Sequence, residues 1–182
     1  MTAAGPAFTV RRATPADVAT IVAHRIAMFH DMGRFPRGDG GVAAEALARA
    51  TADYLAGSVA DGTYAGWLAV DADGGVVGGA GVLLRADVPR QGVDGRVLTG
   101  PQALLLNVYT VPAWRRRGIA AVLVRTAVDW ADARGCSAVV LHASDAGRLL
   151  YERLGLRPTN EMQYHGAPVP LAGRRGPPSP HP

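Results

Sequence analysis

Cysteine is almost absent from this chain of 182 residues, in which Cys136 stands alone. A single cysteine forms no intramolecular disulfide, so the composition suits a reducing compartment. No apolar run approaches the ~20 residues that cross a bilayer, and Met1 to Ala7 lacks the basic start and apolar middle of a secretory signal. These absences exclude a disulfide scaffold and predict a cytoplasmic protein with no membrane partner.

Repeats and extended blocks of like charge are also missing. The chain is 48% hydrophobic and 19% charged, which is typical of a globular protein rather than a disordered or fibrous one. Its length fits one domain with a substantial core. The net charge of +4 favours anionic partners in general but is too small to indicate nucleic acid. Much of that charge is concentrated in Arg115, Arg116 and Arg117.

Hydrophobic periodicity and turn residues predict alternating helices and strands. Thr14 suits a helix cap and Pro15 a first helical turn, and apolar residues then recur at helical spacing. The segment Asp71 to Gly75 separates two runs of β-formers, as in a hairpin. The expected elements are a strand at 8–12, helices at about 14–30 and 43–57, strands at 63–70, 76–84 and 102–110, a helix at 118–134, a strand at 137–143, a helix at 145–154 and a last strand at 157–165.

This order, β-α-α-β-β-β-α-β-α-β, predicts a mixed α/β sheet. Residues 102–143 form a strand-helix-strand unit of the right length for a parallel crossover. Residues 86–100 are expected to form a polar loop. We expect one domain over residues 1–166 and a disordered tail over 167–182, where proline, glycine and arginine dominate.

A strongly apolar strand leads into a basic turn at Leu104 to Ala120. A helix begins inside that turn, so unpaired backbone N–H groups converge beside the positive end of the helix dipole. Gly118 and Ala120 leave this backbone uncovered, and the adjacent arginines add charge-assisted contacts. Such an arrangement favours binding of a diphosphate.

Two motifs in this part of the chain resemble the GNAT superfamily of acyl-CoA N-acyltransferases. Arg115-x-x-Gly118-x-Ala120, after a strand reading Leu-Asn-Val-Tyr, looks like the acyl-CoA signature (Gln/Arg)-x-x-Gly-x-(Gly/Ala). Residues 143–156 resemble the family's closing helix, in which a tyrosine, here Tyr151, lies four residues before a glycine-hydrophobic pair. The resemblance covers about residues 8–165.

The resemblance implies the fold and the co-substrate. The parallel strands at 104–110 and 137–143 would separate and admit the pantetheine arm of acetyl-CoA, which would pair with the backbone of Val108 and Thr110. The residues that would then cradle the pyrophosphate are Arg115, Arg116, Arg117, Gly118, Ile119 and Ala120. An amine would attack the acetyl group directly within a ternary complex, with no metal ion.

The resemblance also suggests catalytic residues. Tyr151 matches the position that often protonates the leaving sulfur, and a neutral phenol suits this role at pH 7. The alternative is a tyrosine that only packs under the sheet. Where some relatives carry a glutamate base, this chain has Leu104, which leaves His142, His24, Asp31, Glu45 or a chain of waters. We take His142 as the candidate.

Acceptor pockets in the family lie near the first two helices and the last strands. That indicates Met28, Phe29, Asp31 and Phe35, with Met32, Trp67 and Glu161 as further candidates. This mixture of apolar surface and a few carboxylates suits a small cationic amine with an apolar body, and a primary amine is the expected acceptor. The same residues also fit an ordinary core. A protein or peptide acceptor, or a non-catalytic acyl-CoA-binding module, remains open. With only one strand expected after Tyr151, an exposed sheet edge favours a homodimer.

Other functional classes lack their signatures. Gly78 to Gly81 is glycine-rich, but no helix pattern follows and neither common nucleotide-binding fingerprint is present. Ser144 lacks the flanking glycines of a nucleophile elbow. His24 and His30 do not share a helical face, so a metal site is not expected. The single basic cluster lacks interleaved aromatics, so no nucleic-acid partner is expected.

Overall fold

The computed structural model describes residues 8–35, 40–92, 95–159 and 161. Strands and helices alternate much as their periodicity predicts. The elements are β1 (Phe8–Arg12), η1 (Pro15–Asp17), α1 (Val18–Asp31), α2 (Gly40–Ala60), β2 (Tyr64–Asp71), β3 (Val76–Arg85), β4 (Arg90–Gln91), β5 (Val97–Leu98), β6 (Gln102–Thr110), η2 (Pro112–Trp114), α3 (Ile119–Ala133), β7 (Ala138–Leu141) and α4 (Asp145–Arg153).

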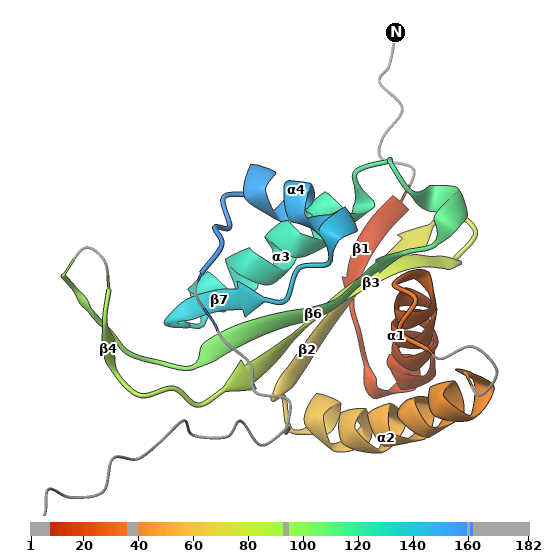
Figure 1. The fold of residues 1–182 in the computed structure, drawn as a ribbon, viewed down its shortest axis with the longest axis horizontal. Coiled ribbons are helices and arrows are strands. Elements are labelled where there is room, and N and C mark those ends of the chain that lie inside the picture. Colours follow the sequence, from red (N-terminus) through yellow and green to blue (C-terminus); the bar gives the residue numbers. More distant parts are fainter. Residues whose placement is uncertain (1–7, 36–39, 93–94, 160, 162–182) are drawn as a thin grey trace, which may run out of the picture.

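A five-stranded mixed sheet in the order β1-β2-β3-β6-β7 forms the centre of the molecule. The first four strands pair antiparallel, whereas β6 and β7 pair parallel through the crossover helix α3. Helices α1 and α2 cover one face of the sheet, and α3 and α4 lie on the other (Figure 1). The expected mixed α/β fold is therefore confirmed.

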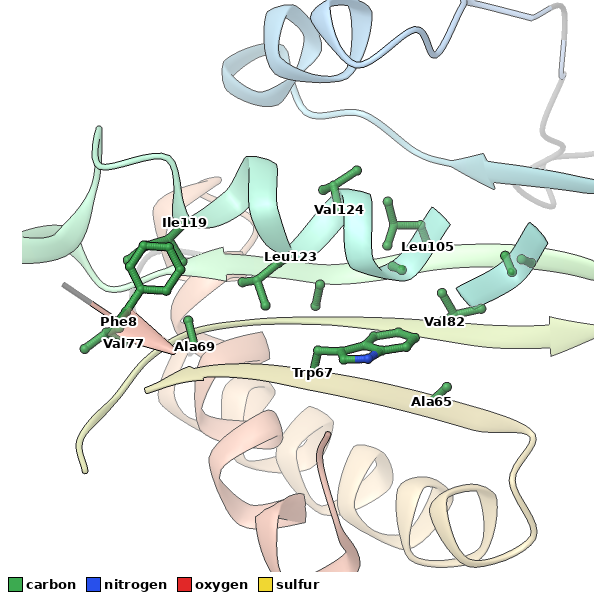
Figure 2. Close-up of a cluster of buried hydrophobic side chains, with 14 residues drawn as sticks. Phe8, Ala65, Trp67, Ala69, Val77, Val82, Leu105, Ile119, Leu123 and Val124 are labelled. Atoms are coloured by element: carbon green, nitrogen blue, oxygen red, sulfur yellow. The ribbon is translucent and has the colours of Figure 1, made fainter. Parts of the chain in front are cut away.

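The main core lies between the sheet and α3. Alternate residues of β2, Ala65, Trp67 and Ala69, point toward this face because successive strand side chains point to opposite sides. Leu123 and Val124 of α3 are fully buried against them (Figure 2). The opposite face packs a smaller cluster of α1 and α2 residues against Tyr64 and Leu68. Both faces of β2 are thus covered.

An irregularity in β6 shapes the centre of the sheet. Gly79 pairs with Tyr109 and Gly81 with Leu106, so Asn107 and Val108 together stand opposite one residue of β3. Asn107 has a φ of 56°, a conformation that asparagine tolerates better than most residues. This is a β-bulge, which bends the strand and re-aims the side chains that follow.

The parallel pairing of β6 with β7 ends just before the bulge. The register runs from Gln102 with Ala138 to Leu105 with Leu141, while β6 continues to Thr110. Beyond Leu105, β6 has no partner strand on its β7 side among the described residues. β7 itself ends at Leu141, so the chain leaves β6 at this point and the edge of β6 beyond Leu105 stays open among the described residues.

Two segments differ from the sequence expectation. Residues 86–100 include the short pair β4 and β5 rather than only a loop, because a turn with hydrogen bonds from Gly92 N–H to Arg96 O and from Gly95 N–H to Gly92 O closes a small hairpin. Residues 157–159 and 161 are not in a strand, and the rest of the expected strand at 157–165 lies outside the described residues, as does the tail at 167–182.

Candidate active site

A cleft of about 1770 Å³ opens where β6 and β7 separate. Its walls come from α1, α2, β6, the loop before α3, the end of β7 and α4. Of the residues that the sequence suggests for the site, those that line the cleft are Met28, Phe29, Asp31, Val108, Thr110, Arg115, Arg116, Gly118, Ile119, Ala120, His142 and Tyr151. Arg117 and Phe35 are not part of the lining.

The loop before α3 presents bare backbone to this cleft. Arg115 is extended, Arg116 has a φ of 65°, and Gly118 is the N-cap of α3 with a φ of 82°. No side chain caps the helix, and a Cβ placed on Gly118 would meet nothing within 4 Å. The N–H groups of the first helical turn have no acceptor inside the helix. An anion can therefore approach them closely, which is the requirement for a phosphate site.

The three consecutive arginines have different positions. Arg115 donates from Nε to the Thr110 carbonyl at 3.1 Å and forms an ion pair with Asp31 of α1. The Arg117 guanidinium stacks 4.7 Å from the centre of the Trp114 ring. Arg116 is exposed at the cleft with its backbone in the left-handed region. The loop is thus tied to α1 at one end, while Arg116 is an exposed part of the cleft lining.

Thr110 adds an unsatisfied polar group beside this loop. Its Oγ1 is buried and has no hydrogen-bond partner among the described residues. Buried hydroxyls without a partner are uncommon, because their desolvation is costly. Together with the unpaired edge of β6 after Leu105, this atom fits an extended polar ligand lying between the two strands.

Tyr151 lies on α4 with its hydroxyl-bearing side chain in the cleft wall. Its ring packs against the main core, and burial raises the pKa of its phenol. Gly147, one helical turn earlier, leaves room for the ring, since a Cβ there would lie 2.9 Å from Tyr151 Cε2. The phenol is therefore protonated at neutral pH, and the Tyr151 side chain is part of the cleft lining.

A polar network that sequence reasoning missed lies at the bulge. Arg25 of α1 donates to Asn107 Oδ1 at 2.6 Å, and Asn107 Nδ2 donates to the Tyr64 hydroxyl at 3.2 Å. All three residues line the cleft. Gly81 makes room for the Tyr64 hydroxyl, because a Cβ there would lie 2.0 Å from it. The one available signal was a polar residue within the apolar run Leu-Leu-Leu-Asn-Val-Tyr.

The candidate bases are dispersed. His142 lies at the end of β7 and is exposed in the cleft. His24 packs beside Tyr109 with a ring-centre distance of 5.1 Å; its Nδ1 is buried without a partner among the described residues, and burial lowers its pKa. Asp31 is paired with Arg115, and Glu45 is an exposed residue of α2 outside the cleft lining. Of these four residues, His142 and Asp31 are exposed and line the cleft, and Asp31 is engaged by Arg115.

The suggested acceptor residues follow the C-terminal half of α1. Met28, Phe29 and Asp31 line the cleft, whereas Phe35 packs against Phe29 and His30, with ring-centre distances of 6.4 and 4.6 Å. Phe35 thus packs against a lining residue, Phe29, but does not itself line the cleft. Among the further candidates, Met32 also lines the cleft, but Trp67 lies in the main core and Glu161 is exposed beyond α4.

Comparison with known proteins identifies the family. The model of the acetyltransferase (GNAT) family matches residues 29–156. The chain belongs to the GNAT family. This acetyltransferase is therefore an acyl-CoA-dependent enzyme. The loop before α3 contains the Arg115-x-x-Gly118-x-Ala120 motif on which the resemblance to this family is based.

Solved structures agree with the GNAT assignment. A GCN5-related N-acetyltransferase from Ralstonia eutropha JMP134 superposes with a TM-score of 0.77 at 30% identity, over 87% of this chain and 97% of that one. A predicted acetyltransferase from Clostridium acetobutylicum, solved with acetyl-CoA, gives a TM-score of 0.72 at 23% identity, over 87% and 95% of the two chains. The second likeness establishes the fold alone.

Two curated proteins that share one name are also similar to this chain. An aminoglycoside N(6')-acetyltransferase type 1 from Stenotrophomonas maltophilia is 29% identical over 167 residues, which span 88% of this GNAT chain and 94% of that protein. A protein of the same name from Acinetobacter genomosp. 13 is 33% identical over 88 residues, which span 45% of this chain and 58% of the relative.

The residues that the structure describes contain no group of three or more His, Cys, Asp or Glu side chains that could hold a metal ion. None of the helices within these ranges has both the length and the hydropathy needed to cross a membrane.

The open backbone at Gly118 gives a prediction with a matched control. Gly118→Ala and Gly74→Ala place a Cβ at φ values of 82° and 84°, with no atom within 4 Å in either case. Each variant should lose about 1–2 kcal/mol of stability from left-handed strain. Only Gly118→Ala should weaken acetyl-CoA binding, measured by calorimetry on the folded variants, because only its methyl group projects into the phosphate loop. Equal affinities for the two variants would contradict this role.

Proposed function

We propose that this enzyme transfers the acetyl group of acetyl-CoA to a primary amine of a small molecule. The observation that carries the proposal is one continuous cleft, which reaches from the phosphate loop past the separation of β6 and β7 to Tyr151 and α1. A concave site with apolar walls and a few polar groups suits a small acceptor. The two aminoglycoside acetyltransferases similar to this chain support a small-molecule amine as the class of acceptor.

The chain's own groups can perform three tasks in this reaction. The loop from Arg115 to Ala120 binds phosphate through backbone N–H groups and through Arg116. The unpaired edge of β6, including Val108 and Thr110, orients the extended arm of the co-substrate by strand-like hydrogen bonds. Acetyl-CoA supplies the activated acetyl group, and Tyr151 donates its phenolic proton to the departing sulfur.

His142 is proposed to accept the proton that the acceptor's ammonium group loses before attack. It is accessible in the cleft wall, three residues before α4, which carries Tyr151. A neutral imidazole has one unprotonated ring nitrogen that can accept a proton. If the pH–rate profile of His142→Gln kept the wild-type acidic limb, His142 would not hold this role.

Replacement of the Tyr151 hydroxyl tests the catalytic part of the proposal. Tyr151→Phe keeps the ring in the core and should lower kcat by about 10²- to 10⁴-fold, the usual contribution of a general acid. Its affinity for acetyl-CoA should stay at the wild-type value. Release of CoA with a panel of small amines measures kcat, and calorimetry measures binding. A kcat within a factor of two of wild type would remove Tyr151 from the reaction.

The same tyrosine sets an expected pH dependence. Burial raises the pKa of Tyr151 above its ordinary value near 10. An acid of raised pKa stays protonated to higher pH, so activity should show no descending limb from Tyr151 below about pH 10.

We also propose a homodimer, because β7 leaves an open sheet edge within the described ranges of the chain. It is the last strand of the sheet and pairs only with β6 among the described residues. An open edge is a site of association unless something covers it. Light scattering after size-exclusion chromatography should give twice the chain mass of 18.9 kDa at micromolar concentration. A mass of one chain would refute the dimer.

A further inference from the structure

Arg25 is a cation in the cleft wall that has no anionic partner within the part of the chain that the structure describes. It is half-buried on α1 and donates to Asn107 Oδ1, and its guanidinium lies 4.9 Å from the centre of the Phe29 ring. Among the described residues, no carboxylate lies within ion-pair distance of it. A guanidinium carries five N–H donors, so donors remain after the bond to Asn107. A partly desolvated charge left in this state is costly unless a ligand supplies the missing anion.

The charges around Arg25 reinforce the need for an anion. Five arginines and two aspartates line the cleft, with no glutamate or lysine among the described lining residues. One of the aspartates, Asp31, is already paired with Arg115. The other, Asp145, begins α4 on the opposite wall. The cleft is therefore positive even after its internal ion pair is counted.

The phosphates of the co-substrate do not account for Arg25. Arg115 reaches α1 at Asp31, six residues after Arg25, which corresponds to about 9 Å along the helix. Arg25 lies instead at the Asn107 bulge, next to the point where β6 and β7 separate. In the proposed function this is where the acceptor amine meets the acetyl group. An anion bound to Arg25 therefore belongs to the acceptor.

We propose that the acceptor is a small amino acid whose carboxylate is bound by Arg25, with its amine directed at the opening between β6 and β7. Asn107 and Tyr64 fix the guanidinium, since Asn107 bridges the two side chains through its amide. Leu104, Leu106 and Met28 supply apolar wall for the acceptor's side chain. This assignment rests on the proposed function and narrows its substrate class to an amine with an adjacent carboxylate.

The test compares four amines that differ in charge. L-Leucine carries the carboxylate, leucinamide and isoamylamine lack it, and kanamycin is a polycationic amino sugar. Calculated per neutral amine, wild-type kcat/KM should be at least about 10-fold higher for leucine than for isoamylamine, since a charge-assisted hydrogen bond contributes on this scale.

Arg25→Gln should lower kcat/KM for leucine by about 10- to 100-fold and for leucinamide by less than about 3-fold. For each amine, the kcat/KM of the wild type is divided by the kcat/KM of the variant, so that differences in basicity between the amines cancel. Arg125→Gln is the matched control, because it removes one positive charge from an exposed site on α3 outside the cleft, and it should change neither ratio. Melting temperature and acetyl-CoA affinity verify that the Arg25 variant is folded.

The outcomes separate this assignment from the function on which it rests. Acetylation of leucinamide, isoamylamine or kanamycin without a preference for leucine would overturn the carboxylate assignment and leave the proposed function standing. An equal loss for leucine and leucinamide in Arg25→Gln would also overturn it. Failure to acetylate any of the four amines, by protein that binds acetyl-CoA, would overturn the proposed function and the assignment together.

Discussion

The early end of the parallel pairing between β6 and β7 is the constraint on which the site depends. Four residue pairs hold the strands together up to Leu105 and Leu141, and β6 then continues for five residues with no strand on that side among the described residues. Backbone groups inside a protein normally find hydrogen-bond partners. We propose that the co-substrate completes the sheet at this open edge beside the cleft.

The bulge at Asn107 connects this opening to the acceptor side of the cleft. The inserted residue turns the Asn107 side chain toward α1, where it joins Arg25 to Tyr64. A regular strand would pair one residue with each residue of β3 and would alternate its side chains without interruption. One irregular residue thus places a polar network at the point where the two strands separate.

Much of the fold follows from local pattern. The bounds of β6 agree with the expectation, and Gly118 and Gly135 delimit α3 because both adopt positive φ. The first helix begins later than expected, because Pro15–Asp17 form a 3-10 turn before α1 starts at Val18. The bare helix N-terminus was also predictable, since an N-cap glycine after three arginines is visible in the sequence. These features depend on residues close together in the chain.

The acceptor side could not be predicted in the same way. Arg25 and Asn107 are 82 residues apart, and their contact depends on how α1 crosses the sheet and on a bulge that periodicity does not reveal. The ion pair between Asp31 and Arg115 spans 84 residues. The hairpin of β4 and β5 was missed because two-residue strands leave no periodic signal. Long-range polar pairing is thus the part of the site that required the structure.

A crystal structure with acetyl-CoA is the most direct test of the opening between β6 and β7 as the co-substrate site. The account predicts the pyrophosphate on the backbone N–H groups at the start of α3, the extended arm along β6 beyond Leu105, and the sulfur beside the Tyr151 hydroxyl. Phosphates bound elsewhere on the molecule, or an arm that does not pass between the two strands, would contradict it.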